Sequence, residues 1–286
     1  MRVPISDNAT VRKTVSFLID EVISSHVKWR GALDHTDGCT TLLTVNWNTE
    51  TLVERLLRSF RRYFDPKMPI VVVDNSPRNG GRELFAPHRV RYLTTGVNLG
   101  HGLALDLGMR YVDTQYTLVC DPDTVILSPR FRQEIERRLR EFGVAGVDTG
   151  NAYYHPLCMA FRTEHWKAGA FSMQEMFPYW DVGGALTNLV GGVNHEALIP
   201  KTRSFGRPLQ PALGGHDVHY LGEAYDDVFS STYLAARVQA EPDREEFDGW
   251  PRAEAVEFHR RWGDWAEAML DGTATFDDFP GDGSRP

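Results

Sequence analysis

Two carboxylates separated by one residue, Asp121 and Asp123, are the side chains of this sequence best suited to carry chemistry. They stand between the apolar runs Tyr116–Cys120 and Thr124–Leu127, which places them at the exit of a buried strand. Buried carboxylates cost free energy unless a cation or hydrogen bonds compensate their charge. A hard divalent cation binds carboxylate oxygens and bridges them to phosphates. The pattern therefore predicts a Mn²⁺ or Mg²⁺ site that serves diphosphate chemistry.

Two other polar segments accompany this pair. Asp74 and Asn75 follow a continuous apolar run, where they form either an ordinary turn or a site at which a carboxylate accepts a hydrogen bond from a nucleobase. Asn98, Gly100 and Gly102 precede an expected helix. Glycines permit close backbone approach, and a helix N-terminus attracts phosphate. We therefore expect this loop to contact a phosphate group.

A dinucleotide-binding or methyl-donor-binding enzyme of the Rossmann type is the first alternative. The segment Gly100-His101-Gly102-Leu103-Ala104-Leu105 resembles a glycine-rich fingerprint, but Leu105 stands where the third glycine belongs. That fingerprint also occupies the first strand-to-helix turn, whereas two such units precede this segment. The sequence therefore favours the metal and diphosphate interpretation.

Alternating strands and helices must position these residues. We expect strands at Thr40–Val45, Ile70–Val73, Val90–Leu93, Tyr116–Cys120 and Val144–Val147, with helices at about 49–64, at Gly102–Val112 and after Ser128. Repeated units of this length predict an α/β fold with a doubly wound sheet, whose ligands lie beyond the carboxyl ends of the strands. A helical extension at 1–37 and a C-terminal helix with an acidic tail at 241–286 flank the expected catalytic domain, 38–240, whose halves are 38–150 and 151–240.

Composition narrows the class of partner. The formal net charge of −8 disfavours a general nucleic-acid binder, which needs clustered Lys and Arg. The three cysteines form no metal-binding pattern, and no apolar stretch reaches the roughly 20 residues of a membrane span. We therefore expect a cytoplasmic protein without a transmembrane segment, and we leave open contact with the inner membrane face and formation of a homodimer. The excess of arginine over lysine hints at a GC-rich bacterial genome.

The order of these motifs resembles the family 2 glycosyltransferases, which have the GT-A fold. The matching segments, in chain order, are Val45-Asn46-Trp47-Asn48, Val72–Ser76, Asn98–Gly102, Asp121-Pro122-Asp123, Ala168–Phe171, Trp180-Asp181 and Val218–Gly222. The resemblance covers about residues 40–235. It implies an inverting, metal-dependent transfer of sugar from a UDP-, GDP- or TDP-linked donor to a hydroxyl of a glycan, glycolipid or natural product.

The resemblance also implies roles for individual residues. Asp181 would be the general base that deprotonates the acceptor hydroxyl. Asp123, Asp121 and His219 would hold the metal. The substrate-binding residues would be Val45, Asn46, Asp74, Asn75, Asn98, Gly100, Gly102, Asp121 and Trp180. Asp121 would thus serve the ribose or the metal, and Trp180 would offer a stacking surface to a sugar or an aromatic acceptor.

The acceptor side departs from the family pattern. Trp180 replaces an acidic residue beside Asp181, and Thr187 stands where an arginine is often found. Asp181 could instead be the N-cap of the following helix. These departures leave a third possibility open, a catalytically silent binding subunit of the same fold.

Overall fold

The computed structural model describes residues 40–64, 66–77, 80–150, 153–168, 172–174, 182–208, 220–232, 235–247 and 250–278. The expected N-terminal extension lies outside this part, as do Trp180, Asp181 and His219. In the described part no helix is both long and apolar enough to cross a membrane.

The main sheet has seven strands in the order β3-β2-β1-β4-β7-β6-β8. Its strands are β1 Thr40–Asn46, β2 Ile70–Asp74, β3 Arg91–Thr94, β4 Tyr116–Cys120, β6 Val144–Val147, β7 Cys158–Arg162 and β8 Leu198–Ile199. Only β7 runs against its neighbours, since β3, β2, β1 and β4 pair in parallel and so do β6 and β8. The predicted α/β fold with a mostly parallel sheet is confirmed.

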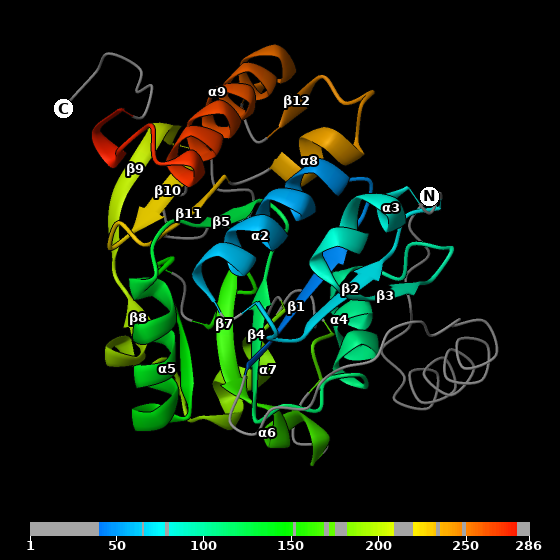
Figure 1. Cartoon of the computed structure of the whole chain (residues 1–286), viewed down its shortest axis with the longest axis vertical. Helices are drawn as coiled ribbons and strands as arrows, with labels where there is room; N and C mark the ends of the chain where they lie inside the picture. Colours follow the sequence, from blue (N-terminus) through cyan, green and yellow to red (C-terminus); the bar gives the residue numbers. More distant parts are fainter. Residues whose placement is uncertain are drawn as a thin grey trace.

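Helices cover both faces of this sheet (Figure 1). The helices of the described residues are α2 Glu50–Tyr63, α3 Gly81–Phe85, α4 His101–Met109, α5 Arg130–Phe142, α6 Thr163–Lys167, α7 Gly184–Leu189, α8 Ala235–Ala240 and α9 Arg252–Asp271, with 3₁₀ turns at Ala86–His88, His195–Ala197 and Phe276–Asp278. Alternate residues of each strand point to opposite faces. In β1, Leu42 packs in the same hydrophobic cluster as α2 and α5, whereas Leu43 packs with α4 and α7.

A second, smaller sheet stands beside the first. It consists of four antiparallel strands in the order β5-β11-β10-β9, with β5 Thr124–Ile126, β9 Lys201–Pro208, β10 Tyr220–Tyr225 and β11 Phe229–Ser231. A short hairpin, β12 Glu246–Phe247 with β13 Trp250–Pro251, precedes α9. The chain passes from the main sheet into the second sheet between β4 and β5, so residues 121–123 form the junction of the two sheets.

The C-terminal helix α9 closes over the second sheet and α2. Trp262 is buried, donates a hydrogen bond from Nε1 to Ser230 Oγ (3.1 Å), and lies beneath the guanidinium of Arg55. Arg55 also pairs with Glu267 of the same helix at 2.8 Å. The predicted amphipathic helix is therefore present, and its apolar face belongs to a third hydrophobic cluster.

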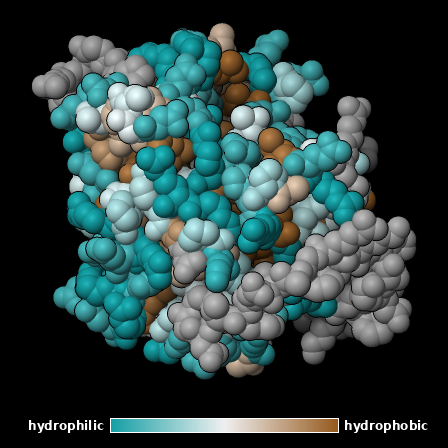
Figure 2. Space-filling view, in the orientation of Figure 1, coloured by the Kyte–Doolittle hydropathy of each residue, from teal (hydrophilic) through white to brown (hydrophobic). Residues whose placement is uncertain are grey.

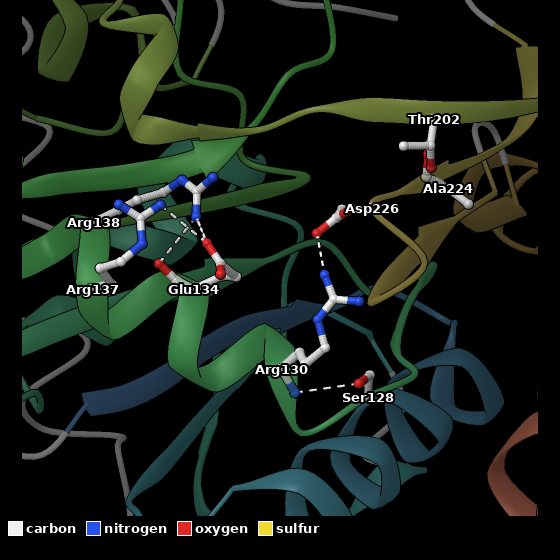
Figure 3. A network of polar contacts seen from close by, with 8 residues as sticks. All are labelled: Ser128, Arg130, Glu134, Arg137, Arg138, Thr202, Ala224 and Asp226. Carbon is white, nitrogen blue, oxygen red and sulfur yellow. Dashed lines mark hydrogen bonds and ion pairs between the residues drawn. The ribbon is translucent and has the colours of Figure 1, made fainter.

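Ion pairs link α5 to the second sheet, and further ion pairs join residues on successive turns of α5. Arg130 pairs with Asp226, in the turn between β10 and β11, at 2.7 Å, and its N–H donates to Ser128 Oγ (Figure 3). Glu134 accepts hydrogen bonds from Arg137 and Arg138 one turn further along (Figure 3). The visible face of the molecule is mainly hydrophilic, with apolar atoms in small separate patches (Figure 2).

Candidate functional site

Polar residues gather where β1, β2 and β4 end, and we call this part of the main sheet the carboxyl edge. Asn46 and Asp74 are register partners at the ends of β1 and β2, and Asp121 follows β4 directly. The strands are parallel neighbours, so residues separated by many positions in the chain meet at one edge. The structure confirms the predicted placement of Asp74 and Asp121 at strand ends.

Asp74 is the centre of a buried hydrogen-bond network. Its Oδ1 accepts from Asn46 Nδ2 (2.9 Å) and from the Ser76 N–H (2.9 Å), and its Oδ2 accepts from the hydroxyl of Tyr92 on β3. Burial, followed by this hydrogen bond to Asp74, raises the pKa of Tyr92. Asp74 itself is fully buried. Its carboxylate therefore links the ends of β1, β2 and β3 through hydrogen bonds. A nucleobase could reach this carboxylate only if the Tyr92 side chain moved.

Replacement of Tyr92 by phenylalanine is expected to lower the free energy of unfolding by about 1–3 kcal/mol. The reason is that Oδ2 of the buried Asp74 would lose its hydroxyl donor without gaining water. Urea denaturation of both proteins measures the difference. Tyr111→Phe is the matched control, because its ring packs beneath Arg91 away from Asp74. A loss in Tyr92→Phe no larger than in the control would contradict the network.

The loop before α4 is shaped by its own amide side chains. Asn75 Nδ2 donates to the Gly100 carbonyl (3.0 Å), and Asn98 Oδ1 accepts from the Gly100 N–H (2.9 Å). Gly100 has φ +85°, a conformation that favours glycine, and it occupies the N-cap position of α4. Asn98 and Gly100 are exposed, so this loop is open to a ligand at the start of the helix.

Gly102 has a different role from its neighbour. A Cβ at this position would lie 2.2 Å from the Met173 carbonyl oxygen. The absence of a side chain at Gly102 therefore allows the backbone of Met173 to pack directly against α4. The sequence predicts close approach of a phosphate here, and contact of Gly102 with a donor stays a prediction. Val45 is likewise placed in the hydrophobic cluster beneath α4, which leaves its backbone as the part that could line a ligand site.

Asp121 and Asp123 lie together at the junction of the two sheets. Asp123 is 7% exposed. Its carbonyl accepts from the Thr232 N–H (2.9 Å), and its Oδ2 accepts a long hydrogen bond from the Ala236 N–H (3.4 Å). Burial, with the nearby charge of Asp121 as the second cause, raises the pKa of Asp123 to about 8. A cation would compensate two carboxyl groups held this close together, so the pair is electrostatically suited to bind one.

His101 joins this pair from the first residue of α4. Its Nε2 lies 3.3 Å from Asp121 Oδ1, with the two side chains 31% and 19% exposed. The sequence offers no spacing that suggests this contact, because it joins a helix start to a strand end 20 residues later. The loop before α4 and the Asp121–Asp123 pair are thus parts of one site.

The donor set fits a hard divalent cation only in part. Carboxylate oxygens are the ligands such cations prefer, and Asp121 and Asp123 supply two of them. Within the ranges given above, no group of three or more His, Cys, Asp or Glu side chains is arranged to hold a metal. Further ligands would have to come from a bound diphosphate and from water, as is usual where Mg²⁺ meets phosphates. His219, the third predicted ligand, lies outside the described residues.

The acceptor side is described only at its borders. The N-cap alternative for Asp181 is wrong, because α7 begins at Gly184 and Gly183 occupies its N-cap position. Gly183 has φ +95°, and a Cβ there would lie 2.0 Å from the Tyr154 carbonyl oxygen. Thr187 accepts from the Tyr154 N–H and donates to the Gly183 carbonyl. Thr187, which departs from the family pattern, thus fixes the chain just after Asp181.

Two solved structures that are similar to this chain were bound to nucleotides or nucleotide sugars. S. aureus TarS 1–349 in complex with UDP is 15% identical with a TM-score of 0.40, and the match covers 47% of this chain and 50% of that one. The mannosyltransferase PcManGT from Pyrobaculum calidifontis in complex with GDP-Man and Mn²⁺ is 14% identical with a TM-score of 0.46, covering 91% and 81%. The chain thus spans about half the length of the TarS fragment that it matches. At these scores the likeness carries no argument about function.

The family comparison is more direct. No curated protein sequence matches the chain. Residues 41–178, however, match the family model described as glycosyl transferase family 2. This span contains the carboxyl edge, the loop before α4 and the Asp121–Asp123 pair. Residues 41–178 of this chain, which carry the candidate site, are therefore similar to a family 2 glycosyl transferase domain.

Proposed function

We propose that this protein transfers a sugar from a nucleotide-diphosphate sugar to an acceptor hydroxyl, with a divalent cation and with inversion at the anomeric carbon. The observation that carries the proposal is the Asp121–Asp123 pair at the carboxyl edge, in which Asp123 is buried and His101 lies beside Asp121 at the start of α4. A Mn²⁺ or Mg²⁺ ion bound there would neutralise the diphosphate as a Lewis acid.

The residues of the chain then have the following roles. The base and ribose lie along the ends of β1 and β2, near Asn46 and Asn75, and contact of the base with Asp74 requires Tyr92 to move. The exposed loop at Asn98 and Gly100 faces the diphosphate at the start of α4, where backbone N–H groups favour an anion. Asp121 and Asp123 hold the cation.

Transfer itself needs one proton acceptor. Asp181 accepts the proton of the acceptor hydroxyl, the hydroxyl oxygen bonds to the anomeric carbon, and the bond from that carbon to the diphosphate oxygen breaks. The nucleoside diphosphate leaves with the electron pair of that bond. A base of this kind must come within hydrogen-bond distance of the hydroxyl. Trp180, the neighbour of Asp181, provides an aromatic surface on which a sugar can stack.

The acceptor is a hydroxyl group of a glycan, glycolipid or natural product, and the reaction takes place in the cytoplasm. The free thiols of Cys120 and Cys158, which are register partners on β4 and β7, agree with a reducing compartment. His219 completes the proposed metal ligands. The proposed catalytic domain is 38–240, with its donor half at 38–150.

A thermal-shift experiment tests the function. UDP, GDP and TDP are each added with and without Mn²⁺, and one of them is expected to raise the melting temperature only when the metal is present, because ligands that bind the native state stabilise it. Stabilisation by NAD(H) or S-adenosylmethionine without metal would favour the Rossmann alternative. Metal-dependent binding without release of nucleoside diphosphate from any nucleotide sugar would favour the silent subunit.

A further inference from the structure

Asp106, on α4, binds three groups from a distant part of the chain. Its Oδ1 accepts hydrogen bonds from Trp166 Nε1 (2.8 Å) and from the Met173 N–H (2.9 Å), and its Oδ2 accepts from Ser172 Oγ. Burial raises the pKa of Asp106, and the three hydrogen bonds oppose that shift. A carboxylate on α4 thereby fixes a segment more than 60 residues further along the chain.

The same segment also packs on Gly102, one turn earlier in α4. Residues at i and i+4 share one helix face, so Gly102 and Asp106 present a single surface to it. A Cβ at position 102 would meet the Met173 carbonyl oxygen at 2.2 Å and Gln174 Cα at 2.8 Å. The Met173 side chain is fully buried in the cluster beneath this helix. Backbone contact, side-chain burial and hydrogen bonds therefore all hold residues 172–174 at the first two turns of α4.

The start of the same helix faces the metal site. His101, its first residue, lies beside Asp121, and Gly100 precedes it in the exposed loop. The segment 172–174 thus runs along a helix whose N-terminus borders the proposed diphosphate site. The chain is fixed again at Val182, which is 1% exposed and belongs to the same hydrophobic cluster.

We propose that Asp106 is a positioning residue for sugar transfer: it clamps residues 172–174 onto α4 and so sets the distance between the donor site and the acceptor side of the domain. The inference rests on the proposed function. Its specific content is that the hydrogen-bond geometry of Asp106 matters, while its negative charge does not.

Two variants separate geometry from charge. Asp106→Ala removes all three hydrogen bonds. Asp106→Asn retains an Oδ1 that can accept from Trp166 and Met173, and its Nδ2 can donate to Ser172 Oγ. Asp113→Ala is the matched control, because Asp113 lies just after the same helix and makes ion pairs with Arg91 and Lys167 at a more exposed position.

Hydrogen exchange and kinetics provide the measurements. In Asp106→Ala we expect faster amide exchange at residues 172–174. With the nucleotide sugar and Mn²⁺ that the wild type turns over, kcat for release of nucleoside diphosphate should fall about tenfold to a hundredfold, since small misplacements are costly. The donor KM should change less than about threefold, because the donor site is retained. Asp106→Asn and Asp113→Ala should behave like the wild type in both measurements.

Each other result overturns the clamp. Unchanged exchange and kcat in Asp106→Ala would show that the hydrogen bonds do not hold the segment. Equal losses in Asp106→Asn and Asp106→Ala would show that the charge matters instead. If the wild type released no nucleoside diphosphate from any nucleotide sugar, the proposed function would fail, and the exchange measurement alone would still decide whether Asp106 fixes residues 172–174.

Discussion

Replacement of Asp123 by alanine should abolish the Mn²⁺-dependent thermal shift produced by a nucleoside diphosphate. Asp123 is almost completely buried next to Asp121, so in the proposed site it would supply a carboxylate oxygen from a fixed position. Turnover of the nucleotide sugar should fall about a hundredfold or more. The reason is that a bound cation would lower the free energy of the transition state by several kcal/mol, because it stabilises the negative charge that develops on the leaving diphosphate. Differential scanning fluorimetry and a nucleoside-diphosphate release assay measure the two effects.

The melting temperature of an Asp123 variant without metal shows whether the substitution removes only the metal site or also unfolds the protein. Without metal, Asp123→Asn should be at least as stable as the wild type, because it no longer buries a carboxylate beside the charge of Asp121. Asp226→Ala, which removes an exposed ion pair with Arg130, is the matched control and should retain the metal-dependent shift. A metal-dependent shift of normal size in Asp123→Ala would refute the assignment of Asp123 as a ligand.

Replacement of Asp181 by asparagine should leave nucleotide binding intact and abolish transfer. An amide cannot take the proton of the acceptor hydroxyl, and loss of a general base typically costs about 10²–10⁴-fold in rate. The chain that follows Asp181 is closely packed, because Val182 is buried and a Cβ at Gly183 would meet the Tyr154 carbonyl oxygen. The thermal shift with nucleoside diphosphate and Mn²⁺ measures binding, and the appearance of glycosylated acceptor measures transfer.

A conservative change elsewhere on the same half controls for surface charge. Glu196→Gln alters an exposed carboxylate in the 3₁₀ turn before β8 and should transfer sugar at the wild-type rate. Full turnover by Asp181→Asn would mean that another group is the base. Loss of nucleotide binding in the same variant would place Asp181 in the donor site instead.

The first half of the fold could be predicted because its strands are continuously apolar. Ile70–Asp74 and Tyr116–Cys120 are buried at every position, and such runs indicate central strands of a parallel sheet. The second sheet could not be predicted in this way. Its strands contain buried polar residues such as Glu223 and Ser230 among the apolar ones, which interrupts the apolar pattern. Glu223 can be buried there because Lys201 and Tyr225 pair with its carboxylate, and these contacts are not visible in the sequence.

The candidate site was predictable where a motif follows a strand, and it was missed where the contacts depend on packing. Asp74 and Asp121 are visible from the apolar runs that precede them. The bond between Tyr92 and Asp74, the approach of His101 to Asp121, and the hydrogen bonds of Asp106 all join residues from different elements. No local spacing encodes such contacts. These contacts depend on the position of α4 relative to the strands of the main sheet. They also depend on the absence of a side chain at Gly102, which leaves space for residues 172–174.

The junction between the two sheets has a further consequence. Asp123 lies where the chain leaves β4 for β5, and its carbonyl is bonded to Thr232, which follows β11 of the second sheet. A cation held by Asp121 and Asp123 would therefore bridge two structural layers as well as serve a substrate. A donor that binds together with this cation would therefore stabilise the connection between the two sheets, and its release would remove that stabilisation.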